Sequence, residues 1–216
     1  MAKLKVSVLV SGSGSNLQAL IDACADAAFP AEIVQVVSNV PDAYGLTRAE
    51  QAGIPTAIVN HKDFDGRESF EDALQKTIEG SGAEFVCLAG FMRLLTDGFV
   101  NHWTDRLINI HPSLLPAFKG LHIHERVIEF GARFSGCTVH FVRPAMDDGP
   151  IIVQAAVPVY GNDTPDDLAK RVLAEEHKIY PLALKLVAEG RTKVIDERVE
   201  IAGMDSPSIA LNNPQS

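Results

Sequence analysis

A neutral amide and an imidazole stand two residues apart where a strand is expected to end. Asn109 and His111 lie in the run INIHPSLLP, which extends from Ile108 to Pro116. Side chains at positions i and i+2 of an extended segment point the same way, so both groups can reach one reacting atom. An amide donor beside a titratable ring suits an oxyanion that develops on a carbonyl carbon. We therefore predict that Asn109 and His111 belong to an active site.

A third polar group could come from the turn-rich segment RPAMDDGP, which contains Asp147 and Asp148 before Gly149. A carboxylate close to His111 would favour the imidazolium form and hold the ring or a water molecule in place. Two aspartates before a glycine are also common turn residues. The functional interpretation therefore requires that this segment lie close to His111.

The run SGSGSN, residues Ser11–Asn16, is a candidate anion site because it follows an apolar strand and opens a helix. Glycines let the backbone approach an anion, and the free amides of a first helical turn supply donors. A dinucleotide fingerprint would need a third glycine where Leu17 stands, so a single phosphate is the better interpretation. In the alternative interpretation, Ser15 or Asn16 merely caps the helix.

Two further groups have weaker signals. The apolar side chains of Gly90–Leu95 could cover a flat ligand, although core packing favours the same composition. His122 and His124 form an HxH pair, but a zinc site needs a third close ligand that the sequence does not specify. We therefore expect no metal.

Strands and helices alternate in the first half of the chain, which predicts a doubly wound, mostly parallel α/β sheet of the Rossmann-like kind. Apolar runs predict strands at 6–10, 33–37, 56–59, 85–89 and 107–110, and helical periodicity predicts helices at 17–27, 44–52 and 68–78. Residues 137–142 and 151–159 predict a late antiparallel hairpin. A long helix should follow, with Thr164 as its N-cap, Gly190 at its end and Pro181 bending or interrupting it.

Composition limits the class of protein. The chain has 216 residues, 46% hydrophobic content and a net charge of -9, which argues against a protein that binds nucleic acid by neutralising phosphates. We expect one domain over residues 1–203 and a disordered tail at 204–216. Three cysteines without a CxxC pair, and no long apolar segment, predict a cytoplasmic protein without a membrane partner.

Taken together, several motifs resemble one family. SGSGSNLQALIDA, SNVPDAYGLTRAEQAGIPT, LAGFMRLL, INIHPSLLP and MDDGP are similar, in this order, to phosphoribosylglycinamide formyltransferase, a folate-dependent enzyme of purine biosynthesis. The similarity extends from about Val6 to about Gly190. It implies formyl transfer from N10-formyltetrahydrofolate, a co-substrate, to the amine of glycinamide ribonucleotide.

The resemblance also implies roles for individual residues. The catalytic set of the family matches Asn109, His111 and Asp147, and the spacing to Gly149 favours Asp147 over Asp148 as the partner of His111. The family's ribonucleotide contacts match Gly14, Ser15, Asn16, Leu173, Ala174, Glu175 and Glu176. Its folate contacts match Arg67, Met92, Arg93, Leu94, Leu95, Asn109, Arg143, Pro144, Ala145, Met146 and Asp147.

Two other functions share parts of this pattern. A formyltetrahydrofolate deformylase-like hydrolase would use the same three polar groups, and a non-catalytic nucleotide-binding module would keep only the fold. Deformylases and the tRNA formyltransferases carry additional domains for which we expect no room here. Both a monomer and a homodimer are compatible with the sequence.

Overall fold

The first strand shows why the central sheet is buried on both faces. In β1 (Leu4–Val10), Val6, Val8 and Val10 pack in one apolar cluster, whereas Leu9 packs in a second cluster on the other face. A strand buried on both faces belongs inside a sheet that helices cover on each side. The computed structural model, which describes residues 2–203 and 211–213, places β1 third in a seven-stranded sheet.

The order of strands in this sheet is β3-β2-β1-β4-β5-β6-β7. The first five in sequence run parallel, whereas β6 runs antiparallel to β5 and β7 antiparallel to β6. The remaining strands are β2 (Ala31–Ser38), β3 (Thr56–Ile58), β4 (Phe85–Leu88), β5 (Leu107–His111), β6 (Phe134–Phe141) and β7 (Ile151–Pro158). A separate hairpin consists of β8 (Thr192–Ile195) and β9 (Arg198–Ile201).

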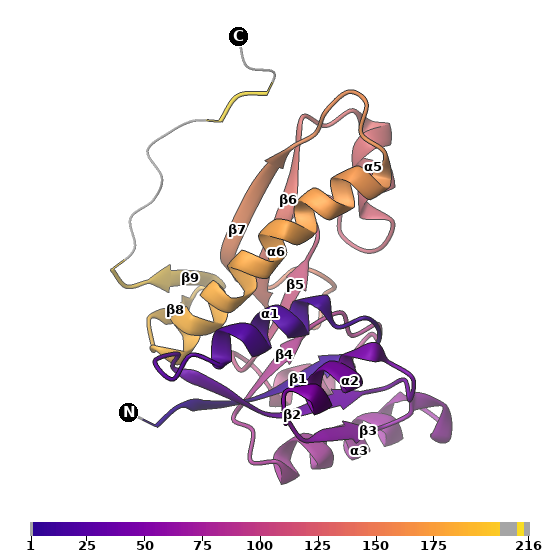
Figure 1. Cartoon of the computed structure of the whole chain (residues 1–216), viewed down its shortest axis with the longest axis vertical. Helices are drawn as coiled ribbons and strands as arrows, with labels where there is room; N and C mark the ends of the chain where they lie inside the picture. Colours follow the sequence, from indigo (N-terminus) through magenta and orange to yellow (C-terminus); the bar gives the residue numbers. More distant parts are fainter. Residues whose placement is uncertain (1, 204–210, 214–216) are drawn as a thin grey trace.

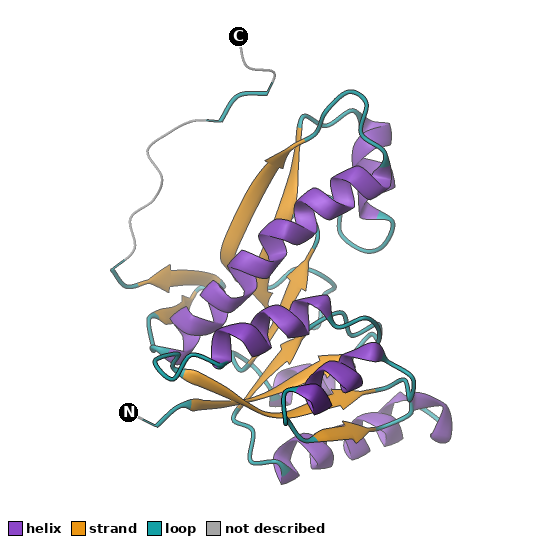
Figure 2. Ribbon diagram, in the orientation of Figure 1, coloured by secondary structure: helices purple, strands orange, loops and turns teal. Residues whose placement is uncertain are grey.

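Helices cover both faces of the sheet (Figures 1 and 2). The larger cluster includes side chains of α1, α2, α5 and α6, and the smaller one includes side chains of α3 and α4. The helices are α1 (Ser15–Cys24), α2 (Tyr44–Gln51), α3 (Arg67–Gly80), α4 (Asp97–His102), α5 (Ile123–Phe130) and α6 (Pro165–Ala188), with a 3-10 turn at His61–Asp63. None of the described helices is both long and apolar enough to cross a membrane.

The predicted α/β class is confirmed. The predicted late hairpin is present as β6 and β7, which form the antiparallel edge of the main sheet. The short helices α4 and α5 and the β8–β9 hairpin were not predicted. Residues 204–210 and 214–216 of the expected disordered tail lie outside the described residues.

The long helix α6 was predicted correctly with Thr164 as its N-cap, and of the two expected effects of Pro181 the interruption does not occur. A proline removes one backbone donor, but packing can hold a helix through that loss. Tyr180 is fully buried and its hydroxyl donates to the Leu88 carbonyl at 2.9 Å, while Leu184 is buried one turn later. Contacts on both sides of the proline therefore fasten α6 to the sheet.

Candidate active site

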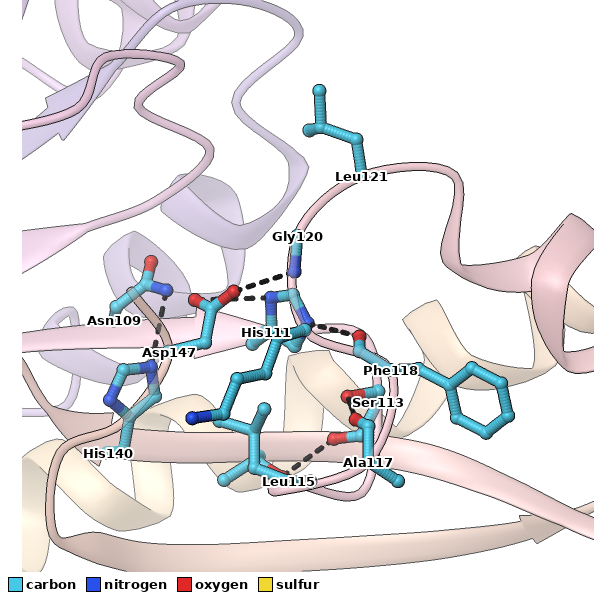
Figure 3. A network of polar contacts seen from close by, with 12 residues as sticks. Asn109, His111, Ser113, Leu115, Ala117, Phe118, Gly120, Leu121, His140 and Asp147 are labelled. Carbon is cyan, nitrogen blue, oxygen red and sulfur yellow. Dashed lines mark hydrogen bonds and ion pairs between the residues drawn. The ribbon is translucent and has the colours of Figure 1, made fainter. Parts of the chain in front are cut away.

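The C-terminal half of β5 places Asn109 and His111 on one face of the sheet. Ile108 and Ile110 point into the cluster around α1 and α6, so the alternating residues point to the opposite face. The structure brings both side chains together with Asp147, as Figure 3 shows. His111 is only 6% exposed, so its ring can be held by protein groups instead of water.

Both nitrogens of the His111 ring have partners. Nε2 lies 3.1 Å from the Phe118 carbonyl oxygen, and Nδ1 lies 3.5 Å from Oδ1 of Asp147 (Figure 3). A carbonyl oxygen is an acceptor, so Nε2 carries the hydrogen that meets Phe118, and Nδ1 is the ring nitrogen that faces the carboxylate. The other Asp147 oxygen, Oδ2, accepts a hydrogen bond from the Gly120 amide at 2.9 Å. The Asp147 carboxyl group therefore lies between the His111 ring and the Gly120 amide.

The two neighbouring aspartates have different partners. The carboxylate of Asp147 faces His111, whereas that of Asp148 contacts the ammonium group of Lys119. Asp147 adopts φ of 51°, a left-handed conformation that an aspartate tolerates better than most residues. The geometry thus selects Asp147 as the neighbour of the imidazole.

The orientation of the Asn109 amide depends on His140, directly opposite on β6. The His140 Nδ1 donates to the Phe141 carbonyl at 2.9 Å, which leaves Nε2 as an acceptor 3.4 Å from Nδ2 of Asn109. Burial lowers the pKa of His140, although the hydrogen bond to Phe141 opposes that shift, and the neutral ring remains an acceptor. One Asn109 N–H is therefore held by His140, and its second N–H is available for a ligand.

A polar network fixes the loop that follows β5. Thr138 donates to the Ser113 carbonyl at 2.7 Å and accepts from the Leu115 amide at 3.1 Å. The Ser113 hydroxyl donates to the Ala117 carbonyl at 2.6 Å (Figure 3). These bonds place the Phe118 carbonyl where it meets the His111 ring.

A cleft of about 680 Å³ opens above the three polar groups. Its lining includes Asn109, His111 and Asp147, together with most of the predicted folate residues: Met92, Arg93, Leu94, Leu95, Arg143, Pro144 and Met146. Large apolar side chains remain exposed there, with Met92 71% and Leu94 54% accessible. Such exposure suits an apolar ligand that would cover them.

Two predicted folate residues are not part of this lining. Arg67 is the first residue of α3, and Ala145 is exposed in the segment between β6 and β7. Arg143 lines the cleft, but its guanidinium group binds Asp105 and Glu197 instead of pointing at the catalytic cluster.

A second region, at the start of α1, has the features of an anion site. Gly14 is the N-cap residue and no side chain caps the helix, so the first-turn amides have no side-chain acceptor. The structure therefore does not support capping by Ser15 or Asn16. A Cβ atom on Gly14 would lie 2.7 Å from Cα of Gly45, and its φ of 69° is left-handed, so glycine is required here.

The predicted ribonucleotide residues on α6 are only partly brought to this loop. Nδ2 of Asn16 donates to the buried Glu176 carboxylate at 2.7 Å, whereas Glu175 pairs with Lys178 and Ala174 is exposed. Leu173 is half-buried. Burial raises the pKa of Glu176, with the hydrogen bond from Asn16 opposing that shift.

Hydrogen bonds join the anion region to the cleft. The Ser11 hydroxyl, directly after β1, donates to Oδ1 of Asn39 at 2.5 Å and accepts from the Met92 amide at 2.8 Å. The loops after β1, β2 and β4 are therefore tied together at the carboxyl edge of the sheet. β1 and β4 are neighbours where the strand order reverses, the usual place for ligands in such sheets.

The HxH pair does not assemble a metal site in the described part of the chain, where no group of three or more His, Cys, Asp or Glu side chains could hold an ion. His122 is exposed and lies 3.9 Å from Glu125. Both histidines line the cleft instead.

Sequence reasoning missed His140 and the Gly120 amide as parts of the site. Thr138 and His140 stand two residues apart in the predicted strand 137–142, and this spacing is a signal for one shared face. Nothing in the sequence indicated which residues of β5 that face would meet, because strand register is a long-range property.

Comparisons with known proteins agree on one family. The formyl transferase model matches residues 4–184. The chain is 45% identical over 204 residues to phosphoribosylglycinamide formyltransferase of Escherichia coli (strain K12), which covers 94% of this chain and 96% of that protein. The crystal structure of glycinamide ribonucleotide transformylase 1 from Symbiobacterium toebii superposes with a TM-score of 0.90 at 46% identity, covering 92% of this chain and 94% of that one.

Longer relatives also match. The trifunctional purine biosynthetic protein adenosine-3 of Bos taurus is 50% identical over 192 residues, or 89% of this chain. This chain spans only 19% of the length of that protein. The matched family model and the near full-length relatives place the chain in the formyl transferase family.

Proposed function

We propose that this formyl transferase moves the formyl group of N10-formyltetrahydrofolate to the amine of glycinamide ribonucleotide. The products are formylglycinamide ribonucleotide and tetrahydrofolate, in purine biosynthesis. The observation that carries the proposal is the grouping of Asn109, His111 and Asp147 at the base of an apolar cleft. The names of the relatives matched over nearly their whole length support the same substrates.

The residues can be assigned to the steps of the reaction. The amine attacks the formyl carbon and forms a tetrahedral intermediate with a negative oxygen. The free N–H of Asn109 and the protonated His111 ring stabilise that oxygen; removing one donor of this kind typically lowers turnover about 10²- to 10³-fold. The carbon–nitrogen bond to folate then breaks, and a proton passes from the attacking amine to the departing nitrogen through His111 or a water held by Asp147.

The two binding regions divide the substrates. The apolar side chains of the cleft cover the folate, and the amides at the start of α1 bind the ribonucleotide phosphate. Glu176, held beside Asn16, is an acceptor for ribonucleotide hydroxyl groups. The hydrogen bonds of Ser11 keep these regions at a fixed distance, so that the amine can reach the formyl carbon.

We also infer that residues 1–203 form one domain, since both binding regions share the seven-stranded sheet. The absence of a nucleic-acid partner and the cytoplasmic location stay predictions from the net charge of -9 and from three cysteines that are free thiols in the structure.

One assay tests the proposal against hydrolysis. Formyl loss from N10-formyltetrahydrofolate is measured with and without glycinamide ribonucleotide, and the nucleotide product is followed by mass. We expect formyl loss only with the amine present and one formylated nucleotide for each folate released. Equal rates without the amine would indicate a deformylase, and no turnover in either case would indicate a non-catalytic module.

A further inference from the structure

The guanidinium group of Arg143 is held by two carboxylates from distant parts of the chain. Its Nε lies 2.7 Å from Oε2 of Glu197, and its Nη2 lies 2.7 Å from Oδ1 of Asp105. A second contact joins Nη2 to Oε1 of Glu197 at 3.4 Å, so the glutamate engages the fork with both oxygens. The Arg143 side chain is only 14% exposed. A planar guanidinium bound on two edges has little freedom to rotate.

Arg143 stands at the beginning of the segment that carries Asp147. This loop, residues 143–149, connects β6 to β7. At its base the Phe141 amide donates to the Pro150 carbonyl at 2.9 Å. The approach is so close that a Cβ atom on Gly149 would lie 1.7 Å from the Phe141 oxygen. The loop therefore leaves and re-enters the sheet through a narrow base, and Arg143 is the anchoring side chain on its outgoing side.

The loop must also extend from one end of β5 to the other. Its first residues lie level with the beginning of β5, since the Val142 amide donates to the Leu107 carbonyl at 2.9 Å. Asp147 nevertheless meets His111 at the end of β5, four residues further on. At about 3.3 Å per residue, that is a climb of about 13 Å. A change in the direction in which the loop leaves β6 would therefore shift the position of the Asp147 carboxylate.

Glu197 reaches Arg143 from a hairpin that lies beyond the family match, which ends at residue 184. Ile195 pairs with Arg198, and the two turn residues Asp196 and Glu197 have φ of 48° and 56°. Positive φ at both central positions is the tight turn that suits a hairpin, although glycine or asparagine usually fills it. The hairpin therefore presents Glu197 at its tip.

We propose that Glu197 and Asp105 are positioning residues that hold Arg143 and thereby keep loop 143–149 in the conformation that binds folate and places Asp147 against His111. The proposal rests on the proposed function for its kinetic consequence. Neither acid lines the cleft, so both act through Arg143. Without these two acids, a smaller fraction of the molecules holds the loop in this conformation. The apparent affinity for folate falls in proportion to that fraction.

The test uses the full chain carrying Glu197→Gln and Asp105→Asn together, which removes both charges with little change in shape. We expect KM for N10-formyltetrahydrofolate to rise about threefold to tenfold, since these are partly exposed ion pairs, with KM for glycinamide ribonucleotide unchanged. Hydrogen exchange of the amides in 145–149 should accelerate by a similar factor in the free protein. In an Arg143→Gln background the two substitutions should add nothing further.

Glu200→Gln is the matched control, because Glu200 is an exposed acid on the same hairpin that makes no ion pair with a described residue. It should leave exchange and both KM values at wild-type levels. The proposal would be overturned if the double variant kept the wild-type exchange rate and the wild-type KM for folate. It would also be overturned if the two acid substitutions raised KM or exchange further in the Arg143→Gln background. Because exchange needs no substrate, it decides the role of the anchor even if the chain fails to formylate the ribonucleotide.

Discussion

Replacing Asp147 by asparagine tests the central part of the site with almost no change in volume. The carboxylate lies 3.5 Å from the His111 ring, and its side chain is 12% exposed. Two unit charges at that distance attract by about 5 kcal/mol at an effective dielectric constant of about 20. Desolvation of both groups offsets part of this energy, and breaking a buried pair typically has a net effect of about 3–5 kcal/mol.

If most of this attraction stabilises the transition state and not the bound substrates, kcat should fall at least about 10²-fold in Asp147→Asn. KM for glycinamide ribonucleotide should change little, since we propose that its phosphate binds at the start of α1 and not at Asp147. His111→Ala should lower kcat by a comparable factor. The double variant should be no worse than His111→Ala alone, because the aspartate acts through the ring.

Steady-state kinetics with each substrate varied in turn measures these effects. Asp148→Asn is the matched control, because that neighbouring carboxylate pairs with Lys119 at a largely exposed position. Exposed pairs contribute about 0–1 kcal/mol, so its kcat should stay within about fivefold of wild type. Near-normal kcat in Asp147→Asn, or equal losses in the two asparagine variants, would refute the reasoning.

Three further predictions concern the start of α1 and Glu176 of α6, which contacts it. Asn16→Asp places a negative charge beside the proposed phosphate site and the Glu176 carboxylate. The Kd of glycinamide ribonucleotide in titration calorimetry should therefore rise at least about tenfold, and an unchanged Kd would remove this residue from the site. Gly14→Ala should lower the free energy of unfolding in urea by about 1–3 kcal/mol, because φ at this residue is 69° and the added Cβ would meet Gly45. Gly12→Ala is the control and should have little effect, because nothing lies within 4 Å of its Cβ position. Equal losses of stability in the two variants would contradict this packing argument. Burial raises the pKa of Glu176 above its ordinary value of 4.5, so the folded state retains a proton that the unfolded chain releases, and stability declines as pH rises above 4.5. In thermal unfolding, Glu176→Gln should show less of this decline than wild type, and parallel curves for the two proteins would contradict it.

The parts of the site that lie on one regular strand could be predicted from the sequence. The spacing of Asn109 and His111 placed them on a common face because alternation in a strand is a local rule. The loop between β1 and α1 was predictable for the same reason, since strand, glycines and helix follow one another directly, and its role as an anion site stays a prediction. Pro181 shows the limit of local rules, because packing of the flanking Tyr180 and Leu184 keeps α6 continuous.

Short or atypical elements were not predictable. The helix α4 has six residues, too few for a clear apolar period, although Thr96 caps it by accepting from the Phe99 amide. The β8–β9 turn lacks the asparagine–glycine signal because Asp196 and Glu197 adopt its left-handed positions. These omissions matter for function, since Glu197 lies at that turn.

The position of Asp147 shows why the complete site is a tertiary property. In a parallel sheet, residues that follow strands gather at one edge, and this rule correctly places the loops after β1, β4 and β5 together. It fails for the loop after β6, because β6 runs antiparallel to β5 and ends level with Leu107, at the opposite end of that strand. The Asp147 carboxylate nevertheless contacts His111 and accepts a hydrogen bond from the Gly120 amide, so the segment between β6 and β7 must return toward the end of β5. The complete site therefore depends on the loop after β5 and, in our proposal, on the anchored base at Arg143, as well as on the strand that carries the imidazole.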